Sequence, residues 1–236
     1  MVSFAMTIPN VKPHIMNAKK IAAEQAVEEI KDGMTVGLGT GSTAYWAIEK
    51  IGEKVQQGLQ IQAVATSTKS EEQAKQLHIP IASFADITHI DITIDGADEV
   101  DENKNLIKGG GGALLREKVI ASNSQKLYIV VDESKLVKHL GRFRLPVEIV
   151  PFAHELTLKK IQSLGGQPII RNVSGKSFIT DNGNLIADCD FYPVTDSSAL
   201  NMQLHMIPGV VETGLFLHNM VHSVIVGYED GKVEVR

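Results

Sequence analysis

The sequence predicts an α/β protein in which a Rossmann-like, mostly parallel sheet is covered by helices and joined to a smaller α+β domain. Short apolar runs alternate with helical segments over residues 18–132, and this alternation is typical of parallel strands covered on both faces. Isoleucines at 90, 92 and 94 alternate with polar residues, which indicates a strand of period two. Near residue 142 the pattern changes to an order of strands and helices that is typical of split βαβ, ferredoxin-like units.

In the first part of the chain we expect four helices, at residues 18–31, 42–57, 68–77 and 113–123. The first of them places Ile21, Ala22, Ala26 and Ile30 on one face, and Gly33 follows it as a stop signal. The apolar runs between these helices predict strands at residues 34–39, 61–67, 79–83, 90–95 and 126–132.

In the second part we expect strands at residues 147–150, 167–171, 177–180 and 185–191, with helices at 154–163 and from about 195 to 206. The residues 181–184, Asp-Asn-Gly-Asn, indicate a hairpin, and Thr195 can cap the last helix. Residues 222–236 predict two strands that can return to the large sheet. We therefore divide the chain into a large α/β domain, residues 1–141 and 217–236, and a small domain, residues 142–216.

Composition excludes several classes of protein. The net charge of −5 argues against a nucleic-acid partner, which would require a basic surface. Cys189 is the single cysteine, so no disulfide forms within the chain and a reducing compartment is favoured. No apolar run reaches the roughly 18 residues of a membrane helix, and the N-terminus lacks the pattern of a secretory signal. We expect a cytoplasmic protein whose first dozen residues form a loose arm.

Residues 37–43, Gly-Leu-Gly-Thr-Gly-Ser-Thr, join an expected strand to an expected helix. Free backbone N–H groups and the helix dipole at such a junction can bind an anion, and Ser42 and Thr43 add hydroxyl donors. Ser42 replaces the third glycine of a dinucleotide fingerprint, and the lysine of a P-loop is missing. The loop therefore favours a single phosphate group, with a capped tight turn as the alternative. Residues 66–70, Thr-Ser-Thr-Lys-Ser, can add hydroxyls at the same edge of the sheet or serve as a helix cap.

The stretch from Asp95 to Lys118 combines carboxylates, lysines and four consecutive glycines, as DGADEVDENKNLIKGGGGALLREK. Each glycine costs about 0.5–1 kcal/mol relative to alanine in a regular element, so the run is typical of a loop that approaches another group closely. Glu117 lies one turn beyond the start of its helix and can act there as a general base. Lys108 can stabilise an oxyanion together with backbone N–H groups. The set suits proton transfer on a small anionic substrate without a cofactor.

Each of these residues also has a purely structural interpretation. Arg116, Lys118 or Lys108 can pair with Glu117 in an ion pair that serves stability alone. Lys135, which follows the strand at residues 126–132, can reach a phosphate or lie exposed in its loop. Asp101 and Glu102 are expected in a solvated turn.

The sequence fits neither a calcium-binding loop nor a zinc site. Residues 101–105 imitate the start of a calcium loop, but Leu106 stands where glycine is required and Gly112 stands where glutamate is required. The eight histidines show no H-E-x-x-H spacing, and a single cysteine makes structural zinc a poor interpretation.

Taken together, these motifs resemble those of type A ribose-5-phosphate isomerases over nearly the whole chain after about residue 18. The resemblance is carried by GLGTGST at 37–43, TSTKS at 66–70, DGADE at 95–99, KGGGGALLREK at 108–118, DESK at 132–135, LPVEIVPFA at 145–153, TDNGN at 180–184 and IPGVVETGLF at 207–216. It implies an enzyme that interconverts ribose 5-phosphate and ribulose 5-phosphate in the non-oxidative pentose phosphate pathway. It further implies no metal or nucleotide cofactor and a homodimer or homotetramer.

The resemblance also implies roles for individual residues. Glu117 matches the base that transfers the proton, and Lys108 matches the residue that stabilises an enediolate. Asp95 and Asp98 match residues that bind the sugar hydroxyls and help to open the ring. The other implied substrate-binding residues are Thr40, Gly41, Ser42, Thr43, Gly96, Ala97, Gly109, Gly110, Gly111, the phosphate contact Lys135 and a second phosphate-binding lysine, Lys19.

Two rival functions stay open. The same fold is associated with sugar-phosphate deaminases and with CoA transferases, so the fold alone does not assign the reaction. A sugar-phosphate sensor without catalytic activity is the other alternative, although the sequence shows no helix-turn-helix segment or basic stripe.

Overall fold

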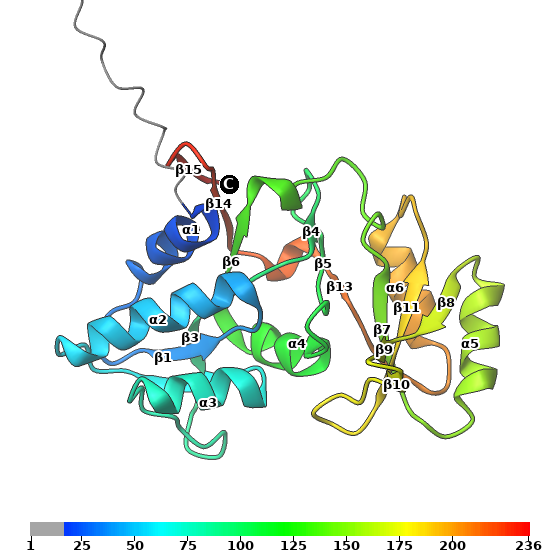
Figure 1. Cartoon of the computed structure of the whole chain (residues 1–236), viewed down its shortest axis with the longest axis horizontal. Coiled ribbons are helices and arrows are strands. Elements are labelled where there is room, and N and C mark those ends of the chain that lie inside the picture. Colours follow the sequence, from blue (N-terminus) through cyan, green and yellow to red (C-terminus); the bar gives the residue numbers. More distant parts are fainter. Residues whose placement is uncertain (1–16) are drawn as a thin grey trace, which may run out of the picture.

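The structure is a computed structural model, and it describes residues 17–236. The expected N-terminal arm lies outside the described residues. A large sheet covered by helices stands beside a smaller sheet with its own helices (Figure 1). This arrangement confirms the predicted combination of a mostly parallel α/β sheet with a smaller α+β domain.

The large sheet has six strands in the order β15-β14-β6-β3-β1-β2. They are β1 (Thr35–Leu38), β2 (Gln62–Ala65), β3 (Ile90–Asp95), β6 (Ser124–Asp132), β14 (Ser223–Gly227) and β15 (Val233–Val235). All neighbouring pairs are parallel except β14 and β15, which are antiparallel. The C-terminal strands thus return to the large sheet as predicted.

Both faces of the large sheet are buried, as β6 shows. Tyr128 and Val130 pack in one apolar cluster with residues of helices α1 (Ala18–Val27) and α2 (Ser42–Gln56). The alternate residues Leu127, Ile129 and Val131 pack in another cluster on the opposite face. The remaining helices of this part are α3 (Thr68–Gln76) and α4 (Leu114–Ser122). Because side chains alternate along a strand, this burial explains why the strands are apolar at nearly every position.

The small domain contains four antiparallel strands in the order β12-β7-β11-β8. Along the chain they follow the sequence β7 (Leu145–Ile149), α5 (His154–Ser163), β8 (Gln167–Ile170), β11 (Leu185–Asp190), α6 (Ser197–His205) and β12 (Val210–Thr213). This βαββαβ order is that of a split βαβ unit. The exact domain boundaries at residues 142 and 216 stay a proposal.

A third, short sheet joins the two domains next to Lys108. Its strands are β4 (Glu99–Val100), β5 (Leu106–Ile107) and β13 (Leu215–Phe216), in the order β13-β5-β4. The Lys108 N–H continues this pairing by donating to the carbonyl of Gly214 at 2.9 Å. These strands are not among the predicted ones, because a strand of two residues shows no periodicity. The other short elements are β9 (Asn172–Val173), β10 (Lys176–Ser177), and the 3-10 turns Glu133–Lys135 and His218–Met220.

Some expected elements differ in the structure. Residues 79–83 make only an isolated bridge, from Ile81 to Ala63, since Pro80 has no N–H for a regular ladder. Residues 177–180 likewise meet β11 at a single bridge, because β11 pairs with β7 and β8 instead. Helix α1 ends at Val27, four residues before its expected end.

The cap of α6 also differs from the expectation. Asp196, not Thr195, caps this helix, with its carboxylate accepting the N–H of Ala199. Among residues 17–236, none of the helices has the length and apolar character needed to cross a membrane.

Candidate active site

Two neighbouring strands of the large sheet, β1 and β3, end at the same edge, and their following residues interlock. Asp95 closes β3, and its Oδ1 accepts the N–H groups of Thr40 at 3.0 Å and Gly96 at 2.8 Å. The loop after β1 passes so close that a Cβ at Gly39 would lie 2.3 Å from this Oδ1. Asp95 therefore holds the loop that leads into α2 at the carboxyl end of the sheet, where ligands bind in folds of this class.

A buried cluster of one lysine and two carboxylates lies beneath this loop. The Nζ of Lys108 is 3.0 Å from Oδ2 of Asp95 and 3.3 Å from Oε2 of Glu117, and it donates to the carbonyl of Gly96 at 2.6 Å. All three charged side chains are less than 5% exposed. One cation thus serves two carboxylates, so the cluster carries an excess negative charge whenever both carboxylates are ionised.

The environment shifts the pKa values of this cluster in ways that suit proton transfer. Burial alone lowers the pKa of Lys108, but Asp95 and Glu117 outweigh it and raise that pKa above its ordinary value. Burial raises the pKa of Glu117, and the charge of Lys108 opposes this only in part. Lys108 therefore stays protonated, while Glu117 is the carboxylate that can exchange a proton near neutral pH.

Glu117 also has a free acceptor atom. Among the buried polar atoms of residues 17–236, its Oε2 makes no hydrogen bond, although Lys108 lies near it as an ion-pair partner. A buried polar atom that lacks a hydrogen bond is unusual in a folded protein. Glu117 also lines the cavity, so its carboxylate lies next to the space that a ligand would fill.

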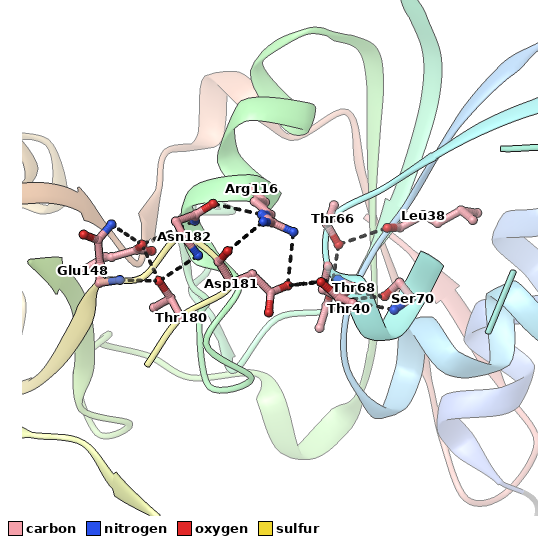
Figure 2. Close-up of polar contacts among 12 residues, drawn as sticks. Leu38, Thr40, Thr66, Thr68, Ser70, Arg116, Glu148, Thr180, Asp181 and Asn182 are labelled. Atoms are coloured by element: carbon pink, nitrogen blue, oxygen red, sulfur yellow. Dashed lines mark hydrogen bonds and ion pairs between the residues drawn. The ribbon is translucent and has the colours of Figure 1, made fainter. Parts of the chain in front are cut away.

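The sequence left open which cation pairs with Glu117, and the structure selects Lys108. Arg116 points away toward the tip of the loop at 180–184, where it contacts Asp181 and Asn182 (Figure 2). Lys118 donates instead to Glu212 and to the carbonyl of Thr213.

The glycine loop, residues 109–112, forms the next wall of the site. The N–H of Gly110 donates to Oδ2 of Asp98 at 2.8 Å. A Cβ at Gly110 would lie 2.6 Å from Oδ1 of the same carboxylate, so only glycine fits without a shift. The loop leads into α4, which begins three residues before Glu117.

These elements enclose a small cavity that most of the expected site residues line. Its lining contains Thr40, Gly41, Ser42, Thr43, Gly96, Ala97, Asp98, Lys108, Gly109, Gly110, Gly111, Glu117 and Lys135. Asp95 lies behind this wall and acts on it through Lys108 and the Thr40 N–H. Lys19 lies beside the cavity, with its Nζ donating to Oγ of Ser42 at 3.0 Å. The structure therefore brings together all the residues that the sequence nominated, with Asp95 and Lys19 just outside the lining.

The start of α2 offers groups that can bind an anion. Gly41 occupies the N-cap position and has no side chain to cap the helix, so no side chain satisfies the first-turn N–H groups, and residues of this turn line the cavity. The hydroxyl of Thr40 contacts those of Thr66 at 2.7 Å and Ser67 at 2.8 Å (Figure 2 shows the Thr66 contact). The hydroxyls of the 66–70 segment thus support Thr40 and do not line the cavity themselves.

Two residues of the small domain, which no sequence pattern marks, contact the large domain at or near the site. Arg171 donates to the carbonyls of Gly109 and Gly110. Asp181 accepts the N–H and the hydroxyl of Thr68 at the start of α3. Both contacts join segments more than 60 residues apart, and no local pattern marks such a pairing. In the described range, no three His, Cys, Asp or Glu side chains come together as a metal-binding group.

Comparison with known proteins identifies the family. The family model for ribose 5-phosphate isomerase A (phosphoriboisomerase A) matches residues 62–231. Ribose-5-phosphate isomerase A of Bacillus mycoides is 54% identical over 218 residues, which cover 92% of this chain and 98% of that protein. The Bacillus cereus protein of the same name is 56% identical over 221 residues, covering 93% of this chain and all of its own length.

Solved structures agree with the sequence relatives. Ribose 5-phosphate isomerase A from Methanocaldococcus jannaschii superposes with a TM-score of 0.87 at 39% identity, covering 92% of this chain and 97% of the other. A D-ribose-5-phosphate isomerase in complex with phospho-erythronic acid superposes with a TM-score of 0.89 at 39% identity, covering 94% and 99%. With the fold, the cavity and these matches in agreement over nearly the whole described chain, the protein belongs to the ribose-5-phosphate isomerase A family.

Proposed function

We propose that this protein interconverts D-ribose 5-phosphate and D-ribulose 5-phosphate, with Glu117 as the proton-transferring base. The observation that carries the proposal is the buried Lys108–Glu117 pair, 3.3 Å apart, at the wall of a cavity that the N-terminus of helix α2 also lines. Family membership supports the reaction. The named ligand of one related structure, phospho-erythronic acid, is a phosphorylated sugar acid and supports a phosphosugar as the substrate class.

The phosphate end of the substrate is proposed to bind at the start of α2. There the first-turn N–H groups and the hydroxyls of Ser42 and Thr43 face an anion together with the helix dipole. Lys135, which also lines the cavity, adds a cation. Lys19 donates to Ser42 and so adds positive charge at the same place. Binding the phosphate there holds the open-chain sugar with its C1–C2 end toward Glu117.

The proton transfer then proceeds through an enediolate. Glu117 removes the proton from C2 of the aldose, and the electrons of that C–H bond form the C1–C2 double bond while charge develops on O1. Lys108 stabilises this charge together with backbone N–H groups. The O2 proton passes to O1, and protonated Glu117 returns its proton to C1, which gives the ketose. Asp98, which lines the cavity, binds the sugar hydroxyls and assists the opening of the ring, whereas Asp95 acts from behind the wall by holding Lys108 and the N–H of Thr40.

The raised pKa of Glu117 suits this cycle, because the same group must take up and release a proton. A general base works best when its pKa lies near the operating pH, and such a group typically contributes about 10²–10⁴-fold to the rate. Positioning and charge stabilisation supply the remainder.

The location and assembly of the protein are also proposals. We propose a cytoplasmic enzyme of the non-oxidative pentose phosphate pathway that works without metal or nucleotide as a homodimer or homotetramer. Phe152, Leu156 and Met206 are large apolar residues exposed on the small domain, and they support contact between copies of the chain. Light scattering tests the oligomeric state, and a monomer at micromolar concentration would contradict it.

The test of the proposed function is the conversion of ribose 5-phosphate to ribulose 5-phosphate in EDTA. We expect turnover by the wild-type protein and a loss of about 10²–10⁴-fold in Glu117→Gln, following the usual weight of general-base catalysis. Glu102→Gln, the same change at an exposed glutamate, is the matched control and should retain activity. Near-normal turnover by Glu117→Gln would remove Glu117 from the base role. Ammonia release from glucosamine 6-phosphate would instead support a deaminase, and binding without turnover would support a sensor.

A further inference from the structure

We propose that Arg171 of the small domain is a positioning residue that sets the orientation of two peptide groups in the glycine loop. Its Nη1 donates to the carbonyl of Gly109 at 2.8 Å and to the carbonyl of Gly110 at 3.0 Å. Arg171 itself does not line the cavity. It reaches the loop from the end of β8 and acts on the site through the backbone.

The two carbonyl contacts determine where the adjoining N–H groups point. In a trans peptide the N–H points away from the carbonyl of the same peptide unit. With the Gly109 carbonyl directed at Arg171, the N–H of Gly110 is directed to the other side, where it donates to Asp98 at 2.8 Å. The Gly110 carbonyl is fixed in the same way, so the N–H of Gly111 is turned away from Arg171. Gly111 lines the cavity, and its N–H is therefore available to a bound oxygen atom.

Arg171 is in turn held rigidly by the small domain. Its Nε donates to Oδ2 of Asp188 at 2.9 Å and its Nη2 donates to Oδ1, which gives a two-point ion pair. The Arg171 side chain is only 12% exposed, and the ring of Phe178 lies 5.9 Å from its guanidinium carbon. The pairing of β8 with β11 places Asp188 beside it. Two nitrogens are thus used for orientation and the third is left for the glycine loop.

The residue type fits this task. Arginine offers several N–H groups in one rigid plane, so one guanidinium can bind a carboxylate at two points and still serve two carbonyls. Lysine has the charge but not the fixed geometry. The positive charge also lies on the carbonyl side of both peptides, where it strengthens hydrogen bonds to those carbonyls. We infer that the small domain shapes the reacting end of the site through this one side chain.

The inference rests on the proposed isomerase function, and its test compares two ligands. Phospho-erythronic acid carries both a phosphate and a sugar-acid chain and is expected to reach the glycine loop, whereas inorganic phosphate offers only the group expected at the start of α2. In Arg171→Met we expect kcat/KM to fall about 10–100-fold, somewhat less than the loss of a direct oxyanion donor. Inhibition by phospho-erythronic acid should weaken at least about tenfold, corresponding to about 1.4 kcal/mol. Inhibition by inorganic phosphate should change less than about twofold, because the anchor at α2 is untouched.

Matched variants separate positioning from general stability. Arg142→Met removes an exposed arginine and should behave as wild type. Arg171→Lys should have kcat/KM close to that of Arg171→Met, because lysine keeps the positive charge but lacks the planar set of N–H donors. Asp188→Asn keeps the volume of the side chain and should weaken inhibition by phospho-erythronic acid more than inhibition by phosphate, to a smaller extent than Arg171→Met. If Arg171→Met does not fold, these two variants carry the test. Wild-type kcat/KM and unchanged inhibition in folded Arg171→Met or Arg171→Lys would overturn the proposal, as would an equal loss for both ligands.

Failure of the proposed function can be told apart from failure of this inference. If the wild-type protein does not isomerise ribose 5-phosphate, calorimetric titration with phospho-erythronic acid replaces the kinetic readout. Weaker binding by Arg171→Met alone would support positioning of the loop even then. Equal binding by wild type and variant, or no binding by either, would overturn it.

Discussion

Replacing Lys108 by methionine tests the charge balance of the active-site cluster. The change removes the cation that lies 3.0 Å from Asp95 and 3.3 Å from Glu117 and leaves two buried carboxylates without it. Methionine has a similar length, so the packing against Phe216, now 5.3 Å from the ammonium group, can be kept. The expected effect is therefore mainly electrostatic.

The structure allows the size of the effect to be worked out. Removing one partner from a buried ion pair typically costs about 3–5 kcal/mol of unfolding free energy. For chains of 150–250 residues, each kcal/mol lowers Tm by about 2–4 °C, so Lys108→Met should lose about 6–20 °C. In the double variant Lys108→Met with Glu117→Gln, one of the two buried negative charges is also removed, and Asp95 keeps its two backbone N–H donors. The double variant should therefore regain half or more of the Tm that Lys108→Met loses.

The loss should depend on pH with a definite sign. Without Lys108, the folded-state pKa of Glu117 rises further above its unfolded value. The folded state then binds more protons than the unfolded state, so the unfolding free energy falls as pH rises from about 4. The difference in Tm between wild type and Lys108→Met should consequently be small at pH 5 and large at pH 8–9.

Thermal unfolding followed by circular dichroism between pH 5 and 9 measures both effects. Lys69→Met, at an exposed lysine, serves as the control for the substitution itself. A Tm of Lys108→Met within about 2 °C of wild type at pH 8, under 1 kcal/mol by the same conversion, would refute the reasoning. So would a loss of equal size at pH 5 and pH 9.

Two further predictions concern the loops around the cavity. Gly110→Ala should lower kcat/KM strongly, because the new Cβ would lie 2.6 Å from Oδ1 of Asp98. Gly111→Ala should have a smaller effect, because its Cβ would lie at an ordinary contact distance, 3.5 Å, from Cγ2 of Thr40. Steady-state kinetics that rank the two variants in the opposite order would contradict this. Asp181→Ala should cost about 1 kcal/mol of stability, since it removes an acceptor at the start of α3 and an exposed ion pair with Arg116. Urea unfolding measures it, and an unchanged midpoint would show that the contact carries no stability.

The parts of the site that the sequence predicted are those fixed by local chain geometry. A glycine loop between a strand and a helix, and carboxylates directly after an isoleucine-rich strand, are placed at one sheet edge by the parallel topology itself. The spacing of Glu117 from the start of its helix likewise turns it toward the loop. These features need no knowledge of distant residues.

The parts that escaped prediction depend on pairings between distant segments. Lys108 is the cation beside Glu117 because the pairing of β5 with β13 directs its side chain inward. The position of Arg171 depends on the register of β8 against β11. Strands of two residues carry no periodic signal, and sheet register is set by packing that a single sequence does not display.

The backbone contact between Lys108 and Gly214 has a consequence for the synthesis of the protein. Lys108 and Glu117 are synthesised long before β13 and Gly214, the segment that holds Lys108 in place. Pairing of such distant segments is slow, since the loop between them must first be closed. The nascent chain therefore carries Lys108 and Glu117 without their final neighbours until β13 has been made and has paired with β5.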